Sequence, residues 1–155
     1  MPGTTIGWWH FAMALAAMAV GGLVAVGRKG TRRHRRLGWL YTGLMLGVNV
    51  TAFLLYELFG RFGPFHVAAL LSLASLLIGW VPMRAGRSRR RVEVHAYWMG
   101  GSYVGLWAAA AAETLGRLPG APFWPMVIGA SVAVTVVGTA IMLWRVPSAL
   151  GRETS

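Results

Sequence analysis

Four histidines and two glutamates are the side chains of this apolar chain whose types and spacing could do chemistry. They are His10, His34, Glu57, His66, His95 and Glu113. The segment 57–61, ELFGR, recurs as 113–117, ETLGR, at an offset of 56 residues, and the first and third histidines share that offset. Imidazole and carboxylate bind borderline metal ions, and paired imidazoles bind haem iron. Ionisable groups inside a bilayer are expensive, so each needs a partner or a function.

One set of these residues is predicted to share a single depth near the outer ends of the membrane helices. The set consists of His10, His66, Glu57 and Glu113. Such a cluster could hold a divalent metal such as zinc or iron, or accept protons. The alternative is that each glutamate pairs with the arginine four residues further along its own helix end, Arg61 or Arg117, and that the histidines merely lie near the interface.

The other two histidines, His34 and His95, are predicted near the cytoplasmic face, each among arginines. Haem b needs imidazoles on opposite sides of the macrocycle and cations near its propionates. We therefore predict a haem b or metal site at this inner pair, with Arg35 and Arg91 at the propionates or at lipid headgroups. A quinone headgroup or a phospholipid phosphate would also find donors here. The alternative is that both histidines end helices and hydrogen-bond to headgroups.

The elements that must position these residues are membrane helices. With 56% hydrophobic residues, 12% charged residues and a mean hydropathy of +0.57, the chain has too little polar surface for an ordinary soluble domain. Five apolar stretches approach the roughly 20 residues that a bilayer requires. They cover residues 6–26, 38–58, 65–83, 95–112 and 123–144. We predict an all-α polytopic protein forming one integral membrane domain, 1–147, followed by a short cytoplasmic tail, 148–155.

The repeated residues predict a duplicated helical hairpin. If spans one and two are related to spans three and four by an axis along the membrane normal, equivalent histidines can face each other in a four-helix core. The fifth span, which has no histidine or acid, is then a supporting helix. Close packing of helices in lipid needs small residues at the contacts. The small residues predicted to lie at these contacts are Ala14, Ala17, Gly21, Gly43, Gly47, Gly101 and Gly105. Asn49 is expected to hydrogen-bond across a helix interface.

The net charge of +11 is concentrated in two predicted loops. The loop after span one holds Arg28, Lys29, Arg32, Arg33, Arg35 and Arg36, and the loop after span three holds Arg84, Arg87, Arg89, Arg90 and Arg91. The positive-inside rule then predicts an N-terminus outside and a C-terminus in the cytoplasm. We interpret the basic runs as topology signals that contact anionic lipid headgroups, not as a nucleic-acid site.

Several function classes lack the residues they need. Cysteine is absent from the sequence, which excludes disulfides, thiolate metal sites and iron–sulfur clusters. The sequence shows no phosphate loop, nucleophile elbow or HExxH helix, so we assign no catalytic residue. Three hypotheses remain: a haem- or metal-binding protein for electron transfer or cofactor handling, a non-enzymatic scaffold or lipid-interacting subunit, and, more weakly, a proton-coupled carrier. Beyond the lipid bilayer, the expected partner is a membrane protein or a second copy of the chain.

A family resemblance rests on motifs spread from about residue 10 to 117. The run 34–41, HRRLGWLY, is followed by Phe65-His66 and then by 91–95, RVEVH, with Met99 and Tyr103 beyond it. This pattern resembles the bacterial membrane family catalogued as domain of unknown function 2306. The resemblance implies a multi-span architecture in a bacterial cytoplasmic membrane. It also marks His34, His66 and His95 as candidate functional residues, but it implies no reaction. Two-haem membrane cytochromes carry two ligand histidines on each of two helices, whereas no predicted helix of this chain carries two histidines.

Overall fold

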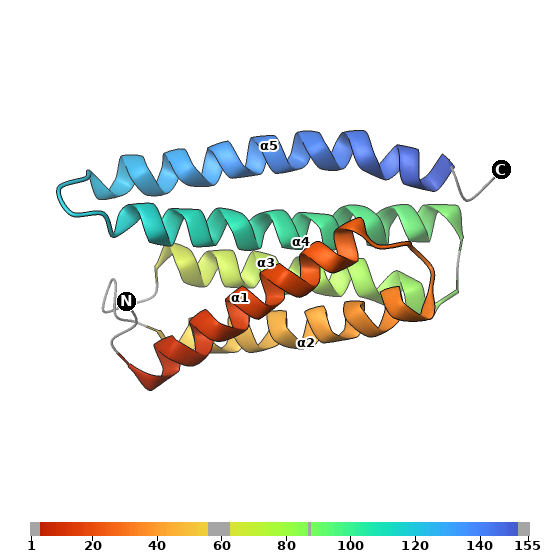
Figure 1. The fold of residues 1–155 in the computed structure, drawn as a ribbon, viewed down its shortest axis with the longest axis horizontal. Helices are drawn as coiled ribbons and strands as arrows, with labels where there is room; N and C mark the ends of the chain where they lie inside the picture. Colours follow the sequence, from red (N-terminus) through yellow and green to blue (C-terminus); the bar gives the residue numbers. More distant parts are fainter. Residues whose placement is uncertain (1–3, 56–62, 87, 152–155) are drawn as a thin grey trace. The chain divides into compact units, whose positions relative to one another are not determined.

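The computed structural model describes residues 4–55, 63–86 and 88–151. Every regular element in these ranges is an α-helix, so the predicted all-α class is confirmed (Figure 1). The helices are α1 (Thr5–Val26), α2 (Arg32–Leu54), α3 (Pro64–Arg84), α4 (Arg89–Gly116) and α5 (Phe123–Gly151). Each contains one of the five predicted apolar stretches, except that the second stretch ends inside the undescribed segment 56–62.

Hydroxyl caps set where three helices begin. Thr4, Thr31 and Ser88 each accept a hydrogen bond from the backbone N–H three residues further on. This satisfies one of the N–H groups that the first turn of a helix leaves without a partner. Because capping does not depend on hydropathy, α2 and α4 begin six residues before the apolar stretches that they contain. The arginines at 32–36 and 89–91 therefore lie inside helices and not in loops.

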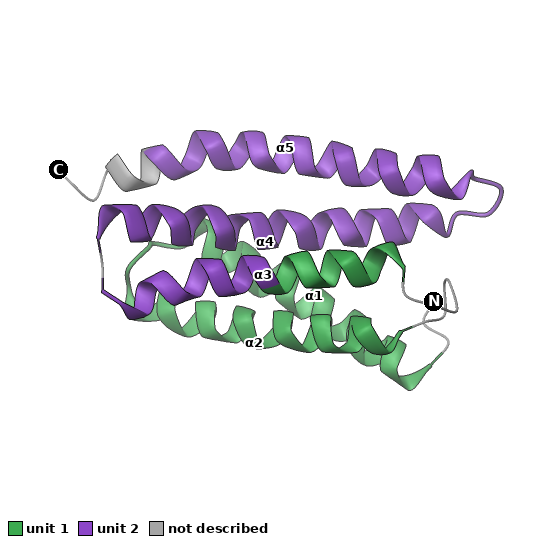
Figure 2. Cartoon of the chain, turned by 180° about the vertical axis from the view of Figure 1, so that it is seen from behind, with its two compact units in different colours: residues 1–73 green, residues 74–155 purple. Residues whose placement is uncertain are grey.

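The chain divides into two compact units, residues 1–73 and 74–155, with the boundary inside α3 (Figure 2). In the first unit α1 packs against α2, and in the second α4 packs against α5. This division does not confirm the predicted repeat of two hairpins, one from spans one and two and the other from spans three and four.

Small residues bring α1 and α2 together, as predicted for Ala17, Gly21 and Gly47, but a Cβ on the predicted Gly43 would have no described atom within 4 Å. Ala17 and Gly21 are buried. A Cβ atom on Gly47 would lie 2.5 Å from the Sδ atom of Met13, so the missing side chain makes room for a methionine of the neighbouring helix. Asn49, which is 2% exposed, donates from Nδ2 to Ser72 Oγ of α3 at 3.1 Å. The predicted cross-helix bond of this amide is confirmed.

Glycines also form the contact between α4 and α5, but on α4 they are not the predicted Gly101 and Gly105. A Cβ on Gly100 would lie 2.7 Å from Met142 Sδ, and one on Gly138 would lie 2.7 Å from both methyl groups of Val104. These pairs run in opposite directions along the two helices, so α4 and α5 are antiparallel. At Gly101 and Gly105, no described atom lies within 4 Å of the place a Cβ would take. Glycine spacing alone did not show which face of α4 meets its neighbour.

Four of the described helices are long and apolar enough to cross a membrane, by length and composition: α1, α2, α3 and residues 123–147 of α5. Their large apolar side chains are widely exposed, as in Leu71 (65%) and Val136 (61%), which suits lipid and not water. In the part of the chain that the structure describes, α4 is not among these four. Arginines at its start, together with His95, Tyr97, Ser102 and Tyr103, lower its hydropathy, so the predicted count of five spans is not confirmed.

Candidate functional site: histidines of the helices

His95 on α4 is held by a backbone carbonyl of α3. Its Nδ1 atom lies 2.8 Å from the carbonyl oxygen of Gly79. A carbonyl oxygen only accepts, so Nδ1 must carry the proton, and in the neutral ring the lone pair is then on Nε2. Metal-ligating histidines usually show this arrangement, with one nitrogen donating to a carbonyl and the other facing the metal.

Met99, one turn after His95 on α4, packs against the same glycine of α3, Gly79. A Cβ on Gly79 would lie 3.0 Å from the Cγ and Sδ atoms of Met99 and 3.2 Å from its backbone nitrogen. Both His95 and Met99 therefore lie against Gly79, and a Cβ at this position would require Met99 to shift by a few tenths of an ångström. Nothing in the sequence marks Gly79 as a partner, because its carbonyl carries no residue-specific signal.

His10 on α1 has the same tautomer for a different reason. Its Nδ1 lies 2.8 Å from Thr51 Oγ1 on α2. That hydroxyl lies 2.8 Å from the carbonyl oxygen of Gly47 and 3.0 Å from that of Val48, so its single proton is directed to the backbone. The oxygen therefore accepts from His10, whose lone pair is on Nε2 when the ring is neutral.

His66 on α3 has the opposite tautomer. Its Nδ1 accepts a hydrogen bond from the backbone N–H of Gly63 at 3.1 Å, which places the proton of the neutral ring on Nε2. The geometry is that of a capping box, in which the side chain of the third helical residue reaches back to the residue before the helix. The ring is 2% exposed and lies 6.2 Å from that of Phe53. This contact fits the interpretation of a histidine that ends a helix.

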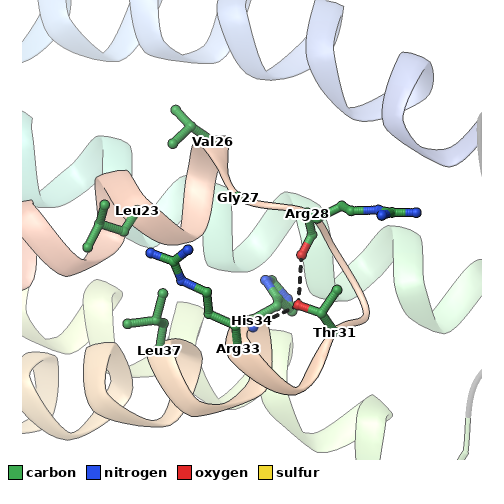
Figure 3. Close-up of a pocket in the computed structure, with 8 residues that line it drawn as sticks. All are labelled: Leu23, Val26, Gly27, Arg28, Thr31, Arg33, His34 and Leu37. Atoms are coloured by element: carbon green, nitrogen blue, oxygen red, sulfur yellow. Dashed lines mark hydrogen bonds between the residues drawn. The ribbon is translucent and has the colours of Figure 1, made fainter.

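His34 is the third residue of α2 and borders a cavity. Its backbone N–H donates to Thr31 Oγ1 at 3.1 Å, and its Nδ1 atom is buried. The cavity, of about 340 Å³, lies where α1 ends and α2 begins (Figure 3). Its lining residues are Leu23, Val26, Gly27, Arg28, Thr31, Arg33, His34 and Leu37.

The predicted inner pair is divided between the two units, because His34 belongs to the first and His95 to the second. The pairing of these two imidazoles therefore stays a prediction. Of the two arginines predicted beside them, Arg35 is exposed. Arg91 donates from Nη1 to the carbonyl of Ala85, which uses one of its five N–H groups to close the loop between α3 and α4.

The predicted outer cluster also stays a prediction. Glu57 lies outside the described residues, and Glu113 belongs to a different unit from His10 and His66. Glu113 Oε1 accepts from Arg117 Nη2 at 2.6 Å, as the alternative interpretation of this acid predicted. Within the described ranges, no group of three or more histidine or acidic side chains is placed to hold a metal ion.

The five helices, their exposed apolar side chains and the imidazoles between them define an α-helical membrane protein. Residues 7–146 match the model of a family described as predicted membrane protein, DUF2306. The match covers most of the chain, so the protein belongs to this family, as its sequence motifs predicted. Neither a curated protein nor a solved structure matches the chain.

Proposed function

We propose that this membrane protein binds haem b or a divalent metal through histidine and serves electron transfer or cofactor handling. The observation that carries the proposal is the hydrogen bond from His95 Nδ1 to the carbonyl of Gly79, at 2.8 Å. It orients the ring, sets the tautomer that metal coordination through Nε2 requires, and raises the basicity of the coordinating nitrogen. His95 is therefore the first proposed ligand.

Haem b fits the surroundings of His95 better than a bare metal ion does. Arg91 precedes His95 by one turn, so the two side chains share a face of α4. One of the five N–H groups of the Arg91 guanidinium donates to the carbonyl of Ala85. A haem propionate could accept hydrogen bonds from the other four. Haem would supply one-electron chemistry at its iron. In this proposal His34 would be a second residue that holds the haem, and Arg35 would be a second propionate partner.

The proposal includes a membrane arrangement. α4 has 28 residues and, at 1.5 Å per residue, is about 42 Å long, more than the roughly 30 Å hydrocarbon core. We propose that α4 also crosses the membrane, which brings the number of spans to five. Helices α1 to α4 would form a four-helix core of two related hairpins, supported by α5. The N-terminus would then lie outside a bacterial cytoplasmic membrane and the C-terminus inside, with the basic segments on anionic headgroups. A membrane protein partner or a second copy would complete an electron-transfer route.

A second proposed function is that of a non-enzymatic scaffold or lipid-interacting subunit. His66 favours it, because its Nδ1 caps α3 and therefore has a structural role without any ligand. The ion pair of Glu113 with Arg117 is likewise a local contact within one helix end. In this case the histidines finish helices and replacing them has only local effects.

Optical and elemental analysis of the full chain, purified in neutral detergent, tests the first proposal. We expect a Soret band and a reduced-minus-oxidised difference spectrum, or a stoichiometric metal, and their loss in His95→Gln. His10→Gln tells the two predicted sites apart, because His10 has the same tautomer but belongs to the predicted outer cluster. If only His10→Gln loses metal, the ligand is in the outer cluster. A folded protein without haem or metal would exclude the cofactor proposal and leave the scaffold.

A further inference from the structure

The cavity at the α1–α2 turn has two chemically different parts. Most of its accessible lining is apolar, from Leu23, Val26 and Leu37, whereas Arg28, Thr31, Arg33 and His34 are the polar residues that border it (Figure 3). All of these residues belong to the first compact unit. The volume of about 340 Å³ is at the lower end of the range for small-molecule sites, about 300–1,000 Å³.

The polar part of the cavity favours an anion. In Figure 3 the Arg33 guanidinium points toward the end of α1 and the side chain of Arg28 extends away from the cavity. Thr31 caps the N–H of His34, which leaves the N–H groups of Arg32 and Arg33 at the positive end of the 23-residue helix α2. A helix N-terminus and an arginine side chain in one cavity both attract negative charge.

The negative end of α1 at the same turn is already compensated. The Lys29 ammonium donates to the carbonyls of Val24 and Ala25, at 2.6 and 2.8 Å. These are among the last carbonyls of α1, which would otherwise repel an anion. No acidic residue occurs between positions 28 and 36 of the sequence, whereas six basic residues do. The turn is therefore positive without an internal counter-charge.

The apolar part of the cavity continues onto a surface suited to lipid chains. Leu23 is 47% and Val26 74% exposed, and both belong to the last turn of an apolar helix long enough to cross a membrane. The cavity thus lies where the apolar stretch ends and the basic run begins, which is the depth of lipid headgroups. A phosphate ester alone would leave this apolar wall without a partner.

We propose that the α1–α2 turn is a binding site for one anionic phospholipid. Its phosphate accepts from the Arg33 guanidinium and the first N–H groups of α2, and its acyl chain follows the apolar wall formed by Leu23, Val26 and Leu37. A headgroup and the first methylenes fit the volume, and the rest of the chains lie along α1. This site is bordered by His34, which the cofactor proposal also uses, but it does not depend on cofactor binding at His95.

Titration calorimetry of the full chain with short-chain phosphatidylglycerol in neutral detergent tests the site. Inorganic phosphate and phosphatidylcholine of equal chain length are the comparison ligands. We expect phosphatidylglycerol to bind more tightly than either. Arg33→Gln should weaken its binding about fivefold, the typical effect of one basic residue at an anionic surface. Arg36→Gln, the same charge change on the same helix away from the cavity, should have no effect.

A second variant tests the cavity without changing the charge. Leu37→Trp fills the space and should weaken phosphatidylglycerol binding while Arg33 is intact, so the proposal stays testable even if Arg33→Gln does not fold. Equal losses for Arg33→Gln and Arg36→Gln, full binding in Leu37→Trp, or equally tight binding of inorganic phosphate would each overturn the proposal. His95→Gln should bind the lipid normally, which separates this result from that of the cofactor proposal.

Discussion

The hydrogen-bond partners of individual histidines separate roles that sequence spacing could not. His95 and His10 both donate from Nδ1, to a carbonyl and to a hydroxyl oxygen, whereas His66 accepts at Nδ1 from a backbone N–H. Only the first two therefore have the neutral tautomer whose lone pair is on Nε2, the nitrogen through which the proposed coordination occurs. His10 and His66 are separated by the same 56 residues as the two repeated segments, but this correspondence does not give the two rings the same surroundings.

Gly79 is the residue whose replacement should disturb His95 most directly. Gly79→Ala would place a Cβ 3.2 Å from the backbone nitrogen of Met99, which cannot rotate away as a side chain does. We expect a loss of about 1–3 kcal/mol in the free energy of unfolding. Unfolding in detergent, followed by circular dichroism, measures it. Gly101→Ala is the control, because no described atom lies near its Cβ position, and equal losses in both variants would contradict this packing.

His66 should be replaceable by another side chain that can cap α3. His66→Gln retains an acceptor at the third helical position, as a capping box requires, whereas His66→Ala removes it. We expect the alanine variant to lose about 1 kcal/mol of unfolding free energy and the glutamine variant clearly less. The same denaturation assay compares them. Equal losses in the two variants would mean that burial of the ring, not capping, is what stabilises this helix end.

At the scale of helices, Thr31 should determine the start of α2. Thr31→Ala removes the oxygen that accepts from His34 N–H at 3.1 Å and should cost about 1 kcal/mol. Thr31→Ser keeps the oxygen and should remain near the parent. Amide hydrogen exchange over residues 32–36 measures the fraying directly. Unchanged protection in the alanine variant would contradict the capping role.

The sequence was sufficient to predict the five helices but not their ends. Apolar stretches predicted each helix because only residues compatible with lipid can fill the bilayer core. Hydropathy does not report capping, so the starts of α2 at Arg32 and α4 at Arg89 were missed. Likewise, α5 continues to Gly151 into the predicted tail, past Pro147.

Partner choice was the least predictable feature of the candidate site. The hydrogen bond between His95 and Gly79 joins residues of two helices, and its acceptor is a backbone atom that every residue has. The ion pair of Glu113 with Arg117 was predictable, because residues four apart on one helix are neighbours by geometry. Local pairs could thus be read from spacing, whereas contacts between helices require the helix packing itself.

At the scale of the whole molecule, the cysteine-free chain suits a labelling test of the proposed five spans. Ala85 lies before α4 and Leu118 lies after it, so the variants Ala85→Cys and Leu118→Cys each place a thiol at one end of this helix. If α4 crosses the membrane, a thiol reagent that cannot pass the bilayer should label Leu118→Cys from outside intact cells and Ala85→Cys only after lysis. Labelling of both from the same side would show that α4 does not span.

The cofactor proposal depends most directly on the state of the His95 ring. Nitrogen-15 NMR of histidine-labelled protein, with the His95 signals assigned by their loss in His95→Gln, reports that state before and after addition of haemin. We predict a protonated Nδ1 and an unprotonated Nε2 in the cofactor-free protein, with the Nε2 signal lost when haemin binds. A protonated Nε2, or a His95 spectrum that saturating haemin leaves unchanged, would contradict the account.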